Sequence, residues 1–273
     1  MLSIFWINFA DAQIDTVAVK ESNPKEGEIY KLKPVVDIPV ILVCGGFSGY
    51  AFTKIYSKDK STEAEILALD KKDVPKIDRW VAGNTDEKAD QVSDIFFYGS
   101  IPYVFTLLLD KKVRKDAGKV GLMYLEAMSI TGLFYTGSVL VIDRYRPETY
   151  NTDIPVDERT TGNNKDAFIA GHPALVATGT FFAASVYADY HPESNWKYVG
   201  YGIAVAATGT TAYLRLLAGK HFPTDLMAGI AVGTLSGILV PKFHKIKSGK
   251  SSNLGLYPFG NGEVKGITAL YKF

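Results

Sequence analysis

Six long apolar segments alternate with polar and charged stretches along this chain of 273 residues. Their lengths lie near the roughly 20 residues that an α-helix needs to cross a bilayer. The pattern predicts an all-α fold, a six-helix bundle that spans a membrane. The segments are residues 35–55, 95–109, 120–142, 167 or 173 to 188, 198–218 and 223–240.

The overall hydropathy leaves a second kind of bundle open. A mean hydropathy of +0.04 is low for a protein with six membrane spans. Segments rich in glycine and alanine, such as 35–55 and 173–188, pack closely in membrane bundles, and they suit a soluble helical core equally well. We therefore keep a soluble helical bundle as the alternative.

Composition argues against two kinds of site or partner. The single cysteine, Cys44, allows no internal disulfide and no cysteine-rich metal site. A net charge of +1 argues against a nucleic-acid-binding protein, in which basic residues would predominate. Local clusters of basic residues occur in two short stretches, 110–119 and 242–250.

The most informative short stretch, residues 214–225, opens the last apolar segment. Arg215, His221 and Asp225 stand there among apolar residues, where bare charge is expensive. Pro223 fits the first position of a helix, so His221 should lie at a helix N-terminus, where free amides and the helix dipole favour an anion. Asp225 follows His221 by about one helical turn. We expect its carboxylate to accept a hydrogen bond from the imidazole and leave the other ring nitrogen free to attack.

Two further short motifs stand on either side of the loop before the fourth apolar segment. Arg146-Pro147 closes the third segment, and Ala-Gly-His-Pro at 170–173 begins the fourth. With the Arg-x5-His-x3-Asp motif at 215–225, they resemble the three-part signature of the type 2 phosphatidic acid phosphatase (PAP2) and vanadium haloperoxidase superfamily. The motifs span residues 146–225, and the apolar segments around them extend the resemblance to 36–240.

The resemblance implies a role for each residue of the three motifs. His221, oriented by Asp225, would attack phosphorus and form a phosphohistidine. His172 would protonate the leaving alkoxide and then activate water. No metal and no other cofactor is expected, because the remaining histidines, His191 and His244, lack partners at metal-ligand spacing and are predicted at the surface. The groups expected to bind phosphate are Arg146, Arg215 and the amide of Gly171.

The substrate that the resemblance implies is a phosphate monoester of a lipid, such as phosphatidate, an isoprenyl phosphate or a lipid A phosphate. Two departures from the family pattern bear on activity. Val139 stands where the family has a lysine, seven residues before the arginine of the first motif, and Ala170 stands where it has a serine. The cations that could compensate are Arg144, Arg159, Lys165 and Lys220.

Three other functions therefore stay open. The chain could be a soluble periplasmic acid phosphatase, or a vanadate-dependent peroxidase of the same fold. It could also be a catalytically weakened membrane protein that only binds its ligand.

The charge of the loops predicts how the bundle is oriented. The basic stretches 110–119 and 242–250 are expected in the cytoplasm, so with six spans the three motifs face the periplasm of a bacterial-type inner membrane. Residues 1–12 are predicted to be a signal peptide cleaved before Gln13. Cleavage combined with six crossings would turn the site inward. An uncleaved signal, fewer crossings and a soluble periplasmic bundle therefore remain open.

The chain divides into four predicted parts. Residues 1–12 are the possible signal peptide, and residues 13–34 are a polar surface tail. Residues 35–247 are the PAP2-like helical phosphatase domain. Residues 248–273 are a C-terminal tail with a predicted β-hairpin, whose turn contains Asn261 and Gly262.

Overall fold

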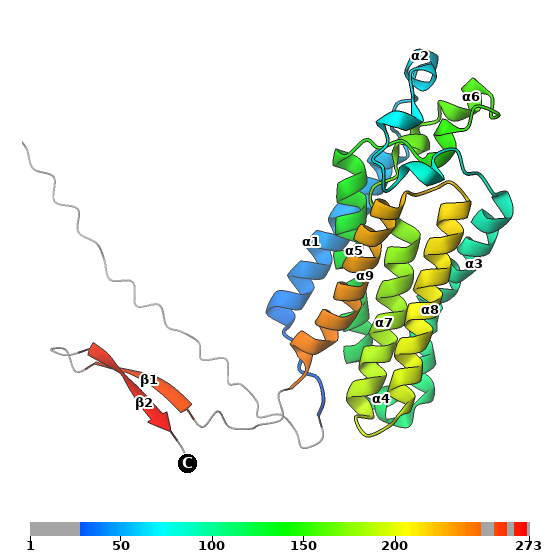
Figure 1. Ribbon diagram of the computed structural model, residues 1–273. Helices are drawn as coiled ribbons and strands as arrows, with labels where there is room; N and C mark the ends of the chain where they lie inside the picture. Colours follow the sequence, from blue (N-terminus) through cyan, green and yellow to red (C-terminus); the bar gives the residue numbers. More distant parts are fainter. Residues whose placement is uncertain (1–27, 247–253, 261–264, 272–273) are drawn as a thin grey trace, which may run out of the picture.

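The computed structural model describes residues 28–246, 254–260 and 265–271. Its main body is a bundle of six long helices that run along one common direction (Figure 1). The long helices are α1 (Pro34–Ile55), α3 (Glu87–Tyr103), α5 (Ala117–Val141), α7 (Gly171–Tyr190), α8 (Trp196–Leu217) and α9 (Pro223–His244).

Three short helices lie at the ends of the bundle. Helices α2 (Glu63–Leu67) and α6 (Val156–Arg159) cover one end, and α4 (Lys111–Lys115) lies at the other (Figure 1). The helical class predicted from the sequence is confirmed. The described residues contain nine α-helices in all, so the predicted number of six describes the long helices alone.

Helix α7 is the centre of the bundle, because α3, α5, α8 and α9 all pack against it. Its contact with α9 is especially close. Gly229, Gly233 and Gly237 follow one another at four-residue spacing and face the α7 backbone. A Cβ atom at Gly233 would collide with the carbonyl oxygen of Ala174. The absence of side chains at these positions therefore sets how closely the two helices approach.

Helix α3 begins eight residues before the predicted apolar segment at 95. Its N-cap is Asp86, whose carboxylate accepts a hydrogen bond of 2.9 Å from the amide of Ala89. The first two turns are polar because they face a charged site, so hydropathy alone did not reveal them. This correction matters for function, since those turns place Asp90 and Asp94 beside the predicted motifs.

Helix α9 continues through Pro241 and ends at His244, whereas the sequence predicted a stop at Pro241. Pro241 lies in the last turn, where the loss of one amide donor costs less than it would mid-helix. The prediction that His244 lies at the surface is wrong: its side chain is 5% exposed. The segment before α1 covers this end of α9, and the amide of Lys31 donates to the carbonyl of His244 over 2.9 Å.

The predicted surface tail 13–34 is accordingly packed at its C-terminal end. Tyr30 is fully buried, and its hydroxyl donates to Asp189 over 2.8 Å. The predicted signal peptide 1–12 and most of the tail lie outside the described residues. At the other end of the chain, β1 (Leu254–Gly260) and β2 (Lys265–Tyr271) pair antiparallel. The predicted turn at 261–262 also lies outside the described residues.

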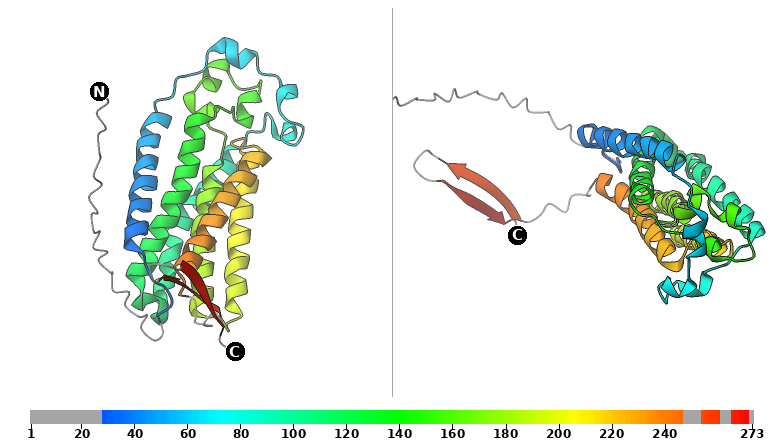
Figure 2. Two further views of the ribbon diagram at one scale, coloured as in Figure 1. Left: turned by 90° about the vertical axis from the view of Figure 1, so that its left-hand side faces the viewer. Right: turned by 90° about the horizontal axis from the view of Figure 1, so that it is seen from above.

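Among the described residues, three segments are long and apolar enough to cross a membrane: α1, the segment Glu87–Leu109 that joins α3 to the 3-10 turn after it, and α9. Their mean hydropathies are 1.7, 1.5 and 1.6. Helix α1 lies on the outside of the bundle (Figure 2) and exposes Leu42 and Val43, while α3 exposes Ile95 and Tyr98. Such apolar outer faces are typical of helices that contact lipid.

Candidate active site

The predicted motifs meet at the end of the bundle where α5 and α8 end and α7 and α9 begin. A cavity of 280 Å³ opens there. Three of the six predicted site residues line it: His172, Arg146 and Arg215. Its other lining residues are Phe52, Ile55, Tyr56, Asp90, Asp94, Tyr135, Asn163, Asp166 and Lys220.

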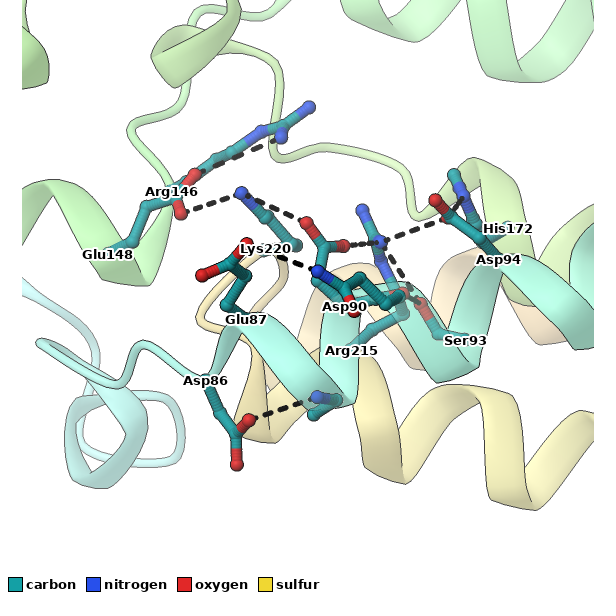
Figure 3. Close-up of polar contacts among 12 residues, drawn as sticks. Asp86, Glu87, Asp90, Ser93, Asp94, Arg146, Glu148, His172, Arg215 and Lys220 are labelled. Atoms are coloured by element: carbon teal, nitrogen blue, oxygen red, sulfur yellow. Dashed lines mark hydrogen bonds and ion pairs between the residues drawn. The ribbon is translucent and has the colours of Figure 1, made fainter.

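Arg215 is the most deeply buried of the cavity's cations, with its side chain 5% exposed. Its guanidinium is paired with Asp90, receives further support from the Ser93 hydroxyl at 3.2 Å, and lies 3.9 Å from Asp94 (Figure 3). All three partners are on α3. The polar first turns of that helix therefore hold the arginine in place at the bottom of the site.

Two further cations line the cavity above Arg215. Lys220 lies 2.8 Å from Glu148 and 3.5 Å from Asp90. Arg146 lies 4.0 Å from the same Glu148 (Figure 3). Arg146, Arg215 and Lys220 thus form a group of three cations whose partners in the structure are carboxylate oxygens. A phosphate group offers the same kind of oxygen to the same three cations.

His172, on the first turn of α7, is held by Asp94. The Nε2 atom of its ring lies 2.8 Å from the Asp94 carboxylate, and the ring stacks near Phe97. A carboxylate in this position fixes the orientation of the imidazole. Burial and the guanidinium of Arg215 outweigh this carboxylate and lower the pKa of His172 to about 4. Sequence reasoning missed both Asp90 and Asp94. Their four-residue spacing after the capping residue Asp86 is the signal that could have revealed them as one face of a helix.

His221 is buried, with its Nδ1 atom 2.7 Å from the carbonyl oxygen of Ala167. Because a carbonyl can only accept, Nδ1 carries the proton and Nε2 keeps its lone pair. Burial, together with the neighbouring guanidiniums of Arg215 and Arg146, lowers the pKa of His221 well below its ordinary value. The ring is therefore neutral near pH 7 and has one nitrogen available as a nucleophile.

The predicted hydrogen bond between Asp225 and His221 is absent. One oxygen of Asp225 accepts from the amide of Phe222 over 2.8 Å, and the other is paired with Arg144. Asp225 is the third residue of α9, and a carboxylate at that position reaches back to the amide at the helix start. The backbone carbonyl of Ala167 orients the imidazole instead.

Arg144 takes part in a network that fixes the start of α9. Its guanidinium lies 2.6 Å from Asp78 and 2.8 Å from the hydroxyl of Thr224. Asp78 in turn accepts from the amide of Thr224 over 3.0 Å and from its hydroxyl over 2.7 Å. This network ties the loop that contains Asp78 to the helix that follows His221. Arg144 is therefore occupied outside the cavity.

Of the four cations considered as replacements for the missing family lysine, Lys220 is the one that lines the cavity. Arg159 donates to the carbonyl of Thr149 over 3.1 Å, and Lys165 lies over the ring of Tyr145. Val139 itself is fully buried.

A lysine absent from the prediction, Lys58, reaches the end of α5 where the family lysine would begin. Its amine lies 2.7 Å from the Val139 carbonyl, 2.8 Å from Asp143 and 3.0 Å from the cavity residue Asp166.

The other predicted residues of the second motif are packed into the wall. Ala170 is fully buried, and its amide donates to the carbonyl of Asp225 over 3.1 Å. Gly171 lies directly against the ring of Tyr135, which leaves no room for a side chain. The missing serine hydroxyl is therefore replaced by apolar contact, while the glycine keeps the start of α7 close to the cavity.

The comparisons with known proteins agree with this geometry. Residues 120–248 match the family model of the PAP2 superfamily. A lipid A 4'-phosphatase of Porphyromonas gingivalis is 26% identical over 148 residues, which are 53% of this chain and 59% of that protein. The chain thus matches somewhat over half the length of this relative. No solved structure matches the chain.

The matched segment contains α7, α8, α9 and nearly all of α5, and it includes all three motifs. Recognition of the superfamily from the motifs is confirmed by this match, in which residues 120–248, just under half of the chain, fit the PAP2 superfamily model.

Proposed function

We propose that this protein is a lipid phosphatase that hydrolyses a phosphate monoester through a phosphohistidine intermediate, with residues 35–247 as the phosphatase domain. The observation that carries the proposal is the pairing of two histidines with different surroundings. His221 is neutral and has one free ring nitrogen, and His172 is held by a carboxylate. A nucleophile and an acid next to three cations are the parts that phosphoryl transfer requires.

In the proposed reaction the phosphate binds among Arg146, Arg215 and Lys220. The Nε2 atom of His221 attacks phosphorus in line, and the bond to the ester oxygen breaks. The negative charge of the bound phosphate favours the protonated form of His172, and His172 gives its proton to the leaving alkoxide. His172 then takes a proton from a water molecule, which attacks the phosphohistidine and releases inorganic phosphate. The cations stabilise the charge that develops on the phosphoryl oxygens.

Asp94 serves as a positioning residue in this scheme, since its contact is with His172. Gly171, at the start of α7, is the candidate for a backbone donor to the phosphate. Asp225 acts indirectly, because it fixes the start of α9 and thereby the loop that carries His221. No metal ion takes part in these steps, which use only the side chains named.

A lipid substrate is favoured by the surroundings of the cavity. Its walls include Phe52 and Tyr56 of the α1 region and Tyr135 of α5, and α1 and α3 expose apolar faces next to it. The relative from Porphyromonas gingivalis is a lipid A 4'-phosphatase, which makes lipid A phosphate the first substrate to test. Phosphatidate and isoprenyl phosphates are the next.

The proposed location is a bacterial inner membrane with the cavity facing the periplasm. The basic helix α4 lies at the end of the bundle opposite the cavity (Figure 1), and basic segments favour the cytoplasmic side. Fractionation of cells would test this location against the alternative of a soluble periplasmic form. It would also test the predicted signal peptide at residues 1–12.

A second candidate function is that of a catalytically weakened PAP2 protein, which binds lipid phosphate without hydrolysing it. Val139 and Ala170 remove one cation and one hydroxyl that the family uses, and Asp90 is paired with the cation at the bottom of the cavity. This candidate predicts binding without turnover.

The deciding experiment measures phosphate release from lipid A, phosphatidate and undecaprenyl phosphate by the full chain in detergent, with EDTA present. The wild type and the control His191→Ala should release phosphate, and His221→Ala should not. His172→Ala should also lose release, because it removes the acid and the base of the two steps. Wild type quenched during turnover should contain a phosphoenzyme that is stable to alkali and labile to acid, and His221→Ala should not. If folded wild type binds these lipids without releasing phosphate, the phosphatase proposal is wrong and the second candidate function is supported.

A further inference from the structure

Three ionisable side chains from three helices meet at the end of the bundle opposite the active site. Asp37 is in the first turn of α1, Glu126 is in α5, and His244 is the last residue of α9. All three are buried, and one ligand atom from each lies within 4.8 Å of the others. Neither the PAP2 motifs nor the proposed reaction uses any of them.

Two polar atoms of this cluster, the Nε2 atom of His244 and the Oε2 atom of Glu126, lack hydrogen-bond partners. The Nε2 atom of His244 lies 3.1 Å from Asp37 and 3.5 Å from Glu126. Even so, Nε2 and the Oε2 atom of Glu126 are buried without a hydrogen bond. Leaving such atoms unpaired in a protein interior is costly, so the cluster needs another partner.

The protonation of His244 shows what kind of partner fits. Its Nδ1 atom lies 2.8 Å from the carbonyl oxygen of Val240, so Nδ1 carries the proton. The Nε2 atom therefore turns a lone pair toward two carboxylates. A proton on Nε2 would make an ion pair with Asp37 at 3.1 Å, but in the geometry present it would make no hydrogen bond to either carboxylate. A cation accepts all three lone pairs at once.

The distances and ligand types favour a particular cation. In a tetrahedral zinc site with bonds of about 2.0–2.1 Å, neighbouring ligand atoms are about 3.3–3.4 Å apart. The separations of 3.1 and 3.5 Å lie on either side of this value. Magnesium and calcium prefer oxygen ligands alone. Two carboxylates and a neutral imidazole around Zn²⁺ give a site with no net charge, as a buried position requires.

The surroundings also have the features of a metal site. The Val240 carbonyl fixes the tautomer of His244, and the amide of Lys33 holds the second oxygen of Asp37 over 2.6 Å. A groove of 440 Å³ between α5 and α9 is lined by both Glu126 and His244, and it provides a route from the surface. Three protein ligands leave a fourth position for water.

We propose that Asp37, Glu126 and His244 bind a structural Zn²⁺ ion that joins α1, α5 and α9. Helix α1 packs mainly on α5, and α1, α5 and α9 lie side by side in the bundle (Figure 2). The ion attaches the outermost helix to α9 as well. Its distance from the cavity makes it separate from the phosphatase reaction, and the two proposals can fail independently.

The test measures metal content in the full chain, purified in detergent with any polyhistidine tag removed. After incubation with ZnCl₂ and desalting, mass spectrometry should find about one zinc per chain in the wild type. The control His191→Ala, whose ring pairs with Asp110 instead, should keep the metal. His244→Ala should lose at least nine-tenths of it, and equal zinc in both variants would overturn the site.

A second measurement does not depend on any variant. Cobalt substituted into the wild type should show the intense visible absorption of a four-coordinate ion, and Zn²⁺ added afterwards should abolish it. Added Zn²⁺ should also raise the thermal midpoint of metal-depleted protein. Wild type that binds neither ion, or cobalt with only the weak bands of six-coordination, would overturn the proposal.

Discussion

Replacing Asp90 with asparagine should raise the affinity of the cavity for phosphate about tenfold. In the structure Asp90 is paired with Arg215 and lies 3.5 Å from Lys220, so a phosphate must displace its carboxylate or share both cations with it. A hydrogen bond to a charged group contributes about 1.5–3 kcal/mol. The Asp90 side chain is 30% exposed, and screening by water points to the lower end of that range. If competition from Asp90 weakens phosphate binding by about 1.4 kcal/mol, removing that competition raises the affinity for phosphate tenfold.

The assay is competitive inhibition by inorganic phosphate and by vanadate, compared in the wild type and Asp90→Asn at equal ionic strength. Ser93, at 3.2 Å, still holds the arginine in the variant, and asparagine keeps the shape of the aspartate. The matched control is Asp94→Asn, which removes a carboxylate that lies 3.9 Å from Arg215 and should change the inhibition constants less. Weaker phosphate binding in Asp90→Asn would refute the reasoning. Asp90 would then orient Arg215 for the substrate and not compete with it.

Three further predictions follow from the same geometry. Asp94→Asn should lower kcat at least tenfold with little change in KM, because His172 loses the carboxylate that orients it; steady-state kinetics with a soluble phosphate ester checks this, and an unchanged kcat contradicts it. Gly233→Ala should lower the free energy of unfolding by about 1–3 kcal/mol, because the new methyl group overpacks against α7. The control Gly209→Ala, whose Cβ meets nothing within 4 Å, should leave that free energy unchanged or raise it. Thermal unfolding in detergent distinguishes the two variants, and equal midpoints would contradict the role of the close contact. Because the pKa of His221 is depressed in the folded protein, the unfolded chain takes up a proton below about pH 6.5 that the folded chain does not. Stability should therefore fall as the pH is lowered from 7 to 5, and His221→Asn should make that dependence shallower; an unchanged dependence would show that the ring is not buried as described.

The sequence was sufficient for the parts of the fold that depend on long apolar runs. Helices α5, α7, α8 and α9 begin within four residues of their predicted positions. Helix α3 was misjudged because its first two turns face charged partners, so a hydropathy signal could not reveal them. The end of α9 was misjudged because Pro241 is tolerated in a last helical turn. Both errors come from reading local polarity or a proline without knowing which tertiary partners surround it.

The site was predicted to the extent that it lies in contiguous motifs. Arg146, His172 and Arg215 line one cavity as expected from their order in the chain. Asp90 and Asp94 come from a helix that no motif marks, and only the packing of α3 against α7 and α8 brings them there. The expected pairing of Asp225 with His221 failed for a local reason, since a carboxylate at the third position of a helix is captured by the amide at its start.

The missing family lysine illustrates why the charge of a cavity cannot be judged from one sequence position. Val139 is apolar, but Lys58 reaches the same end of α5 from the loop before α2 and is held there by Asp143 and Asp166. These two carboxylates thus neutralise the charge of the Lys58 amine. Lys220, in contrast, lines the cavity together with two arginines. Lys220 shares Asp90 and Glu148 with those arginines. A phosphate dianion that displaces these carboxylates would therefore meet three cations. Three cations therefore line the cavity although the family's lysine is absent.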